Sequence, residues 1–128
     1  MKDVDAISSD VIGEAIKIHR ELGPGLLESV YEIVLSAALV RMGYKVSRQV
    51  PIDIEYDGLK IGAAFRVDIL VEGILVVEIK AVEQLGKVHA KQLLTYLRLM
   101  KQPLGLILNF FRVDHEGRHP SFGQRSPF

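Results

Sequence analysis

The 128-residue sequence contains no cysteine, which excludes disulfide bonds, thiolate metal sites and a cysteine nucleophile. This absence fits a reducing compartment, and we expect a cytoplasmic protein. The sequence also lacks an apolar run of membrane-spanning length, so no membrane partner is expected. Its polar, acidic start, "MKDVDAISSD", does not have the pattern of a signal peptide. Aromatic residues make up only 7% of the chain, so strong stacking on single-stranded nucleic acid is not indicated.

Net charge is also lacking: 16 basic residues balance 16 acidic ones. Overall charge therefore does not indicate a nucleic-acid-binding protein. The distribution is uneven, because residues 1–36 hold 3 basic and 7 acidic side chains, whereas residues 37–128 hold 13 and 9. A nucleic-acid partner would have to contact a local basic surface in the second segment.

The length and pattern predict one domain, residues 1–111, followed by a polar tail, residues 112–128, that we expect to be loosely ordered. Two helices come first in the domain, one after the cap residues Ser8, Ser9 and Asp10 and one over residues 26–42. Three strands with hairpin turns follow, then an amphipathic helix and a short apolar strand. The first strand is expected over residues 44–56, and another strand starts after the turn at Asp57-Gly58. The further expected ranges are 62–71, 74–81, 88–102 and 104–110.

This element order, αα-βββ-α-β, predicts an α/β fold of the α+β type. Adjacent strands joined by hairpin turns should be antiparallel, and the last strand–helix–strand unit should be a parallel crossover. We therefore expect a mixed four-stranded central sheet with flanking helices.

The predicted hairpin "FRVDILVEGILVVEIK" carries Asp68, Glu78 and Lys80 where its strands should be most apolar. Because side chains alternate between the faces of a strand, Glu78 and Lys80 share one face. A two-residue turn at Glu72-Gly73 would place Asp68 and Glu78 on opposite faces. A three-residue turn, such as residues 71–73, would place all three charged side chains together.

We predict the odd-length turn, because it leaves the other face of both strands apolar. In the first strand that face would comprise Val67, Ile69 and Val71. Two adjacent carboxylates repel each other and persist where a cation or a proton lies between them. Oxygen ligands without histidine or cysteine suit Mg²⁺, with Mn²⁺ as a substitute. The alternative is a solvated strand face on which Lys80 pairs with one of the acids.

Three motifs in order carry a resemblance to a known family: "GLLESVY" at residues 25–31, "VD" and "EIK" in the hairpin, and "HAKQLLTYL" in the next helix. Together they resemble the GxxExxY family of the PD-(D/E)XK nuclease superfamily, over about residues 8–111. The resemblance implies a restriction-endonuclease-like fold and a metal-dependent nuclease. One departure is Val67, which stands where the superfamily name has proline.

The resemblance also implies roles for individual residues. Asp68, Glu78 and the backbone carbonyl of Ile79 would hold the metal ion, with Glu28 from the second helix completing the site. Lys80 would orient the attacking water and stabilise charge at the phosphorus. The alternative for Glu28 is a first-turn glutamate that is favoured by the helix dipole.

Further residues are candidates for auxiliary or substrate-binding roles. Gln92 and Tyr96 match the Q-x-x-x-Y element of RecB-like nucleases. Tyr31 lies on the side of Glu28, although core packing explains it equally well. His89 could bind phosphate or act as an acid, although a surface histidine is the simpler interpretation. By charge alone, the candidates for phosphate contacts are Lys45, Arg48, Lys60, Arg66, Lys87 and Lys91.

The function predicted from sequence is therefore Mg²⁺-dependent hydrolysis of nucleic-acid phosphodiester bonds, with DNA favoured over RNA. A homodimer or a partner protein would help a small neutral domain to grip a duplex. The alternative is a non-catalytic module for nucleic-acid binding or protein interaction on the same fold. Convergence of the acids in one place would favour the nuclease.

Overall fold

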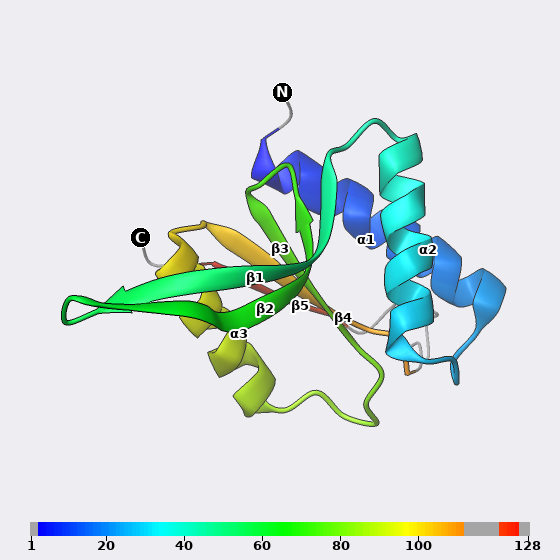
Figure 1. Cartoon of the computed structure of the whole chain (residues 1–128). Helices are drawn as coiled ribbons and strands as arrows, with labels where there is room; N and C mark the ends of the chain where they lie inside the picture. The colour runs from blue at the N-terminus through cyan, green and yellow to red at the C-terminus, as the bar shows by residue number, and fades with distance from the viewer. Residues whose placement is uncertain (1–2, 112–120, 126–128) are drawn as a thin grey trace.

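The computed structural model describes residues 3–111 and 121–125. A twisted sheet forms the middle of the molecule and carries helices on both faces (Figure 1). Within the described residues, no helix is both long and apolar enough to cross a membrane. The helices are α1 (Val4–Leu22), α2 (Glu28–Arg41) and α3 (Lys87–Met100), and the strands are β1 (Val46–Tyr56), β2 (Leu59–Val71), β3 (Leu75–Lys80), β4 (Leu104–Asn109) and β5 (Ser121–Arg125).

The strands are arranged in the order β1-β2-β3-β4-β5. Strands β3 and β4 are parallel, and the other neighbouring pairs are antiparallel. The predicted mixed sheet with flanking helices is confirmed. The sheet gains a fifth strand, β5, from residues 121–125, which the sequence analysis assigned to the tail. The rest of that tail, residues 112–120 and 126–128, lies outside the described residues.

Helix α1 begins earlier than the sequence analysis predicted. Its N-cap is Asp3, whose side chain accepts a hydrogen bond from the Ala6 backbone N–H at 2.8 Å. Ser8, predicted as a cap, is instead buried within the helix, and Asp10 accepts a hydrogen bond from the hydroxyl of Tyr44. The prediction was wrong because an acceptor at Asp3 serves the free N–H groups of the first turn equally well.

The core has two parts, one on each face of the sheet. Helices α1 and α2 pack over one face, and α3 packs over the other. Strand β4 is buried throughout and contributes alternate side chains to the two parts. Gly105 faces α3, where a Cβ atom would lie 2.8 Å from the Leu93 Cδ1 atom. The absence of a side chain there allows α3 to lie close to the sheet.

The turn between β2 and β3 has three residues, Glu72–Ile74, between the paired residues Val71 and Leu75. Glu72 and Gly73 both adopt positive φ angles, 55° and 70°. The predicted odd length is confirmed, and the turn lies one residue later than residues 71–73. The register that continues from this turn sets Asp68 opposite Glu78.

Strands β1 and β2 pair on both sides of Gln49 and Asp68 but not at these two residues themselves. Gln49 has a φ angle of 51° in the middle of β1. Beyond this irregularity Val67 packs with the α3 side of the core, whereas Ile69 packs with the α1–α2 side. The expectation that the side chains of Val67 and Ile69 share one face of the sheet is therefore wrong. The buried side chains of β2 therefore change face between Val67 and Ile69, next to the irregularity at Gln49.

Candidate active site

The candidate site lies in a fork between β2 and β3. These strands pair only over residues 69–71 and 75–77, after which β2 continues along β1 while β3 continues along β4. Figure 1 shows the β1–β2 hairpin turning away from β3 and β4. Backbone N–H groups at the opening of such a fork lose their neighbouring strand and need other acceptors.

Asp68 and Glu78 supply these acceptors to each other's strand. The Asp68 backbone N–H donates to Glu78 Oε2 at 2.8 Å, and the Ile79 backbone N–H donates to Asp68 Oδ2 at 2.8 Å. Each carboxylate therefore occupies the place of a missing backbone carbonyl, and the reciprocal bonds hold the two acids side by side. The predicted adjacency of the acids is present in the structure.

Glu78 is buried, with 6% of its surface exposed. Burial, followed by the nearby charge of Asp68, raises the pKa of Glu78 from 4.5 to about 7. The hydrogen bond from the Asp68 N–H and the charge of Lys80 lower the pKa of Glu78, while the charge of Glu32 raises it. Ionising Glu78 beside Asp68 is therefore unfavourable at neutral pH, and a cation bound between the two acids would offset that cost.

Lys80 follows Glu78 by two residues on β3 and is half-buried. Hydrogen bonds hold the backbone on both sides of Lys80 in place. The Phe110 backbone N–H donates to the Lys80 carbonyl at 2.8 Å, and Asn109 exchanges hydrogen bonds with both backbone groups of Val82, at 2.9 and 3.1 Å. Asn109 is itself buried. These contacts fix the direction in which β3 presents the lysine beside the acids.

Helix α2 brings two glutamates to this region. Glu28 Oε2 accepts a hydrogen bond from the Ala81 backbone N–H at 3.0 Å, directly after Lys80. Glu28 is exposed and does not join Asp68 and Glu78 in a cluster, because within the described part of the chain no three acidic, histidine or cysteine side chains gather to hold a metal ion. Its contact with Ala81 ties α2 to the end of β3. A ligand role for Glu28 stays a prediction.

Glu32, one helical turn further, was missed as a site residue. It is 4% exposed and connects to the acids through β1. Arg48 binds Glu32 Oε2 through Nε at 2.9 Å and through Nη2 at 2.8 Å. Gln49 Nε2 donates to Glu32 Oε1 at 2.7 Å and to Asp68 Oδ1 at 3.3 Å. The available signal was a second carboxylate four residues after Glu28 in a largely apolar helix.

Helix α3 approaches the acids from the other face of the sheet. Burial and then the charges of Glu78 and Asp68 raise the pKa of Tyr96, so this tyrosine lies within electrostatic reach of both. Its ring stacks on Phe65 of β2, with centroids 4.1 Å apart. The prediction that this helix overlooks the site fits the position of Tyr96.

The other candidates around α3 have less specific surroundings. Gln92 is exposed on the helix, and Arg66 is exposed on β2. His89 Nδ1 accepts a hydrogen bond from the Gly86 backbone N–H at 3.0 Å. This bond caps the start of the helix, so the observed contact of His89 is structural.

Comparison with known proteins agrees with this geometry. The sequence model of the PD-(D/E)XK nuclease superfamily matches residues 5–119. The chain belongs to the PD-(D/E)XK nuclease superfamily. Its mixed sheet with flanking helices is consistent with the restriction-endonuclease-like fold of that superfamily.

Among the solved structures that resemble this chain is the crystal structure of SSO0001, with a TM-score of 0.53 and 15% sequence identity. The match covers 95% of this chain and 78% of that one, and at this identity it shows the fold alone. No curated protein matches the chain. Superfamily membership therefore rests on the sequence model and on the position of the D…E-x-K residues.

In this superfamily member, Tyr31 of "GLLESVY" lies in the core and has no surface exposed. Its hydroxyl donates to the Gly23 carbonyl at 2.5 Å and accepts from the Leu26 backbone N–H at 3.2 Å. Its ring stacks on Phe110, with centroids 4.4 Å apart. The observed contacts of Tyr31 thus hold the α1–α2 loop, which positions the start of α2 and Glu28. The structure places this side chain away from a substrate-contacting position.

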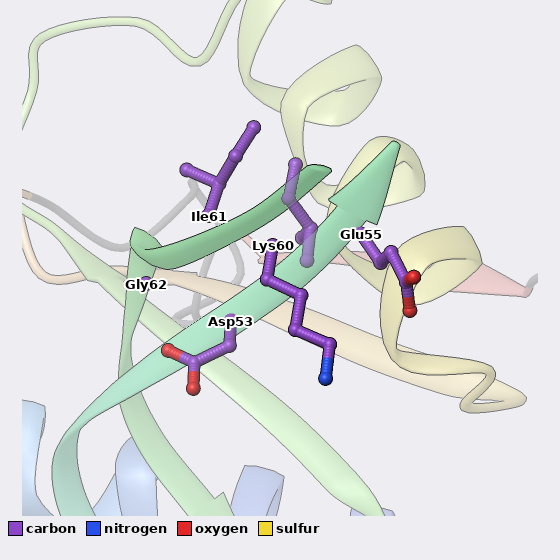
Figure 2. Close-up of a pocket in the computed structure, with 6 residues that line it drawn as sticks. Asp53, Glu55, Lys60, Ile61 and Gly62 are labelled. Carbon is purple, nitrogen blue, oxygen red and sulfur yellow. The ribbon is translucent and has the colours of Figure 1, made fainter. Parts of the chain in front are cut away.

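A surface hollow of about 390 Å³ lies on the β1–β2 hairpin and not at the acids. Figure 2 shows its lining residues on the two strands of the hairpin. A bulge shapes it: Asp53 faces the extra residues of β2, and its Oδ1 accepts from the Ala63 backbone N–H at 2.8 Å. The hollow is lined by Asp53, Ile54, Glu55, Lys60, Ile61 and Gly62.

Proposed function

We propose that the protein is a divalent-metal-dependent nuclease of the GxxExxY group, acting on DNA in preference to RNA. The observation that carries the proposal is the reciprocal bonding of Asp68 and Glu78, which sets two carboxylates side by side with Lys80 two residues away. Membership of the PD-(D/E)XK nuclease superfamily supports a nuclease and a nucleic-acid substrate.

The donor set suits a hard divalent cation. Asp68 and Glu78 would hold Mg²⁺, for which Mn²⁺ could substitute, and the carbonyl of Ile79 is a further candidate ligand. The raised pKa of Glu78 supports this fit, because a cation beside the two acids would offset the cost of ionising a buried carboxyl. Mg²⁺ commonly binds one or two carboxylates and keeps several waters, so a pair of acids is sufficient.

Each residue of the site then has a defined task. Bound by the acids, the cation would polarise the scissile phosphodiester and stabilise the leaving oxygen. Lys80 contributes a fixed positive charge beside Glu78, which orients the attacking water and stabilises negative charge that develops at the phosphorus. Asn109 keeps the backbone after Lys80 in place through its two bonds to Val82.

The surroundings of the site suggest how nucleic acid would approach. Tyr96 and Phe65 form a stacked pair close to the acids and would border the bound strand. The near-zero net charge favours a homodimer, or a complex with a partner protein, to provide enough basic surface for a duplex. A cytoplasmic location fits the cysteine-free sequence.

A cleavage assay tests the proposal. Labelled single-stranded, double-stranded and branched DNA and RNA would be incubated with Mg²⁺, Mn²⁺ or a chelator, comparing the wild type with Glu78→Ala and Lys80→Ala. We expect metal-dependent cleavage that both substitutions abolish. Cleavage that persists in both variants would refute the assignment of the site. Binding of the same nucleic acids without cleavage, unchanged by metal or by the substitutions, would instead indicate a non-catalytic module.

A further inference from the structure

Gln49 is an unusual residue in β1. Its φ angle of 51° lies in the left-handed region, which costs a residue other than glycine of the order of 1 kcal/mol or more. The other non-glycine residues with positive φ lie in turns, at a bulge or at the end of a helix, as Asp57, Glu72, Ala63 and Lys101 do. Gln49 interrupts β1 at the level of Asp68, whereas Ala63 lies in β2 at the bulge opposite Asp53.

The strained conformation directs the side chain of Gln49 to two acids at once. Its Nε2 atom donates to Glu32 Oε1 at 2.7 Å and to Asp68 Oδ1 at 3.3 Å. A primary amide has two N–H donors and no charge, so it can bridge two carboxylates without adding charge to the site. Since the Ile79 N–H already binds Oδ2, the bridge fixes both oxygens of Asp68.

The bridge is itself anchored on the side of α2. Arg48 binds Glu32 with two nitrogen atoms and so offsets part of the charge of this buried glutamate, which still raises the pKa of Glu78. One oxygen of Glu32 is left for Gln49. The Arg48–Glu32–Gln49 chain therefore connects the third acid to Asp68 through a neutral amide, and it holds that amide in a fixed orientation.

We propose that Gln49 is a positioning residue for the proposed metal site: its amide, anchored by the Arg48–Glu32 ion pair, sets the orientation in which Asp68 meets the cation. The inference rests on the proposed function, because it concerns the same cation. Partners that orient metal ligands typically contribute 10- to 100-fold to metal affinity or activity. Arg48 then serves the site through Glu32, and its predicted phosphate contact is not needed to explain its position.

The test compares Gln49→Met, which keeps the length of the side chain and removes its donors, with Gln102→Met as a matched control. Gln102 lies between α3 and β4, and its Nε2 donates a single hydrogen bond, to the Gly73 carbonyl of the β2–β3 turn at 3.2 Å. Gln49→Gly is a second variant, because glycine accepts the left-handed backbone and keeps the fold if methionine does not. Mn²⁺ affinity would be measured by calorimetry for each protein.

We expect the dissociation constant for Mn²⁺ to rise by at least about tenfold in Gln49→Met and Gln49→Gly, and by less than about twofold in Gln102→Met. In the cleavage assay, kcat should fall in the Gln49 variants while KM for the nucleic acid stays unchanged. Wild-type Mn²⁺ affinity in both Gln49 variants would overturn the proposal, since a purely structural glutamine would change stability alone.

A metal-free measurement separates this inference from the proposed function. In the ¹H–¹⁵N spectrum recorded with chelator, the side-chain amide signal of Gln49 should shift in Asp68→Asn and in Glu32→Gln, and that of Gln102 should not. If the wild type bound no metal but these shifts occurred, the metal-dependent function would fail and the positioning of Asp68 would stand. If the Gln49 signal did not respond to either substitution, the bridge and the inference would fail.

Discussion

Replacing Glu78 with glutamine should make the protein more stable above neutral pH while removing its proposed chemistry. Glu78 is buried, with only 6% of the residue exposed, and the pKa of its carboxyl is raised to about 7. Glutamine has the same size, and its amide oxygen can still accept the hydrogen bond that the Asp68 N–H donates at 2.8 Å. The substitution therefore removes the cost of ionising a buried acid and retains the packing.

The magnitude follows from the shift in the pKa of Glu78. A change from 4.5 to about 7 is about 2.5 pKa units, which corresponds to about 3 kcal/mol at most, at 1.36 kcal/mol per unit. The raised pKa means that the folded state binds the proton more tightly than the unfolded state. This contribution to stability is fully present below pH 4.5 and is lost as the pH rises through 7. Above about pH 8 the folded wild type carries the full free-energy cost of ionising Glu78. The Glu78→Gln variant has no carboxyl at this position and carries no such cost.

The assay is thermal unfolding with chelator at pH 5 and at pH 8.5, followed by circular dichroism. For a chain of this length, about 3 kcal/mol corresponds to a rise in Tm of about 10 °C, expected at pH 8.5 and largely absent at pH 5. Glu83→Gln is the matched control, because Glu83 is exposed on the loop after β3 and should leave Tm nearly unchanged at both pH values. A Tm for Glu78→Gln at pH 8.5 equal to or below that of the wild type would refute the reasoning. A rise in the Tm of Glu78→Gln at pH 5 as large as that at pH 8.5 would also refute it.

Two further substitutions test the packing around the site. Gly105→Ala should lower the free energy of unfolding by about 1–3 kcal/mol in urea titrations. The new Cβ would lie 2.8 Å from Leu93 Cδ1 and push α3 from the sheet. An unchanged free energy of unfolding would show that α3 moves freely. Tyr31→Phe should cost about 1–2 kcal/mol in the same titration, because the bonds of its hydroxyl to Gly23 and Leu26 are lost. A neutral result there would show that water replaces the hydroxyl in the α1–α2 loop.

Local patterns in the sequence predicted the parts of the fold that depend on nearby residues. The turn at Asp57-Gly58 follows from two residues that accept positive φ, and both adopt it, at 50° and 79°. The odd-length turn before β3 followed from the alternation of apolar residues on both strands. That alternation was sufficient to bring Asp68 and Glu78 together, because both lie within a few residues of the same hairpin.

The features that the sequence did not predict depend on contacts between residues far apart in the chain. Gln49 reaches Glu32 and Asp68 over 17 and 19 positions, and no periodicity in β1 indicates the left-handed backbone that makes this contact. Glu32 was visible only as a polar exception in an apolar helix. The buried side chains of β2 change face at Asp68, beside the same irregularity, and a strictly alternating strand therefore misplaced Val67.

The central claim is that Asp68 and Glu78 together hold a divalent cation, and calorimetric titration of the protein with Mn²⁺ tests it most directly. The wild type should bind one ion, and Asp68→Asn and Glu78→Gln should each weaken binding at least about tenfold. At pH 6.5 binding should also release protons, seen as heat that depends on the buffer, because Glu78 with a pKa of about 7 must ionise. Absence of binding, or binding that neither substitution weakens, would contradict the account.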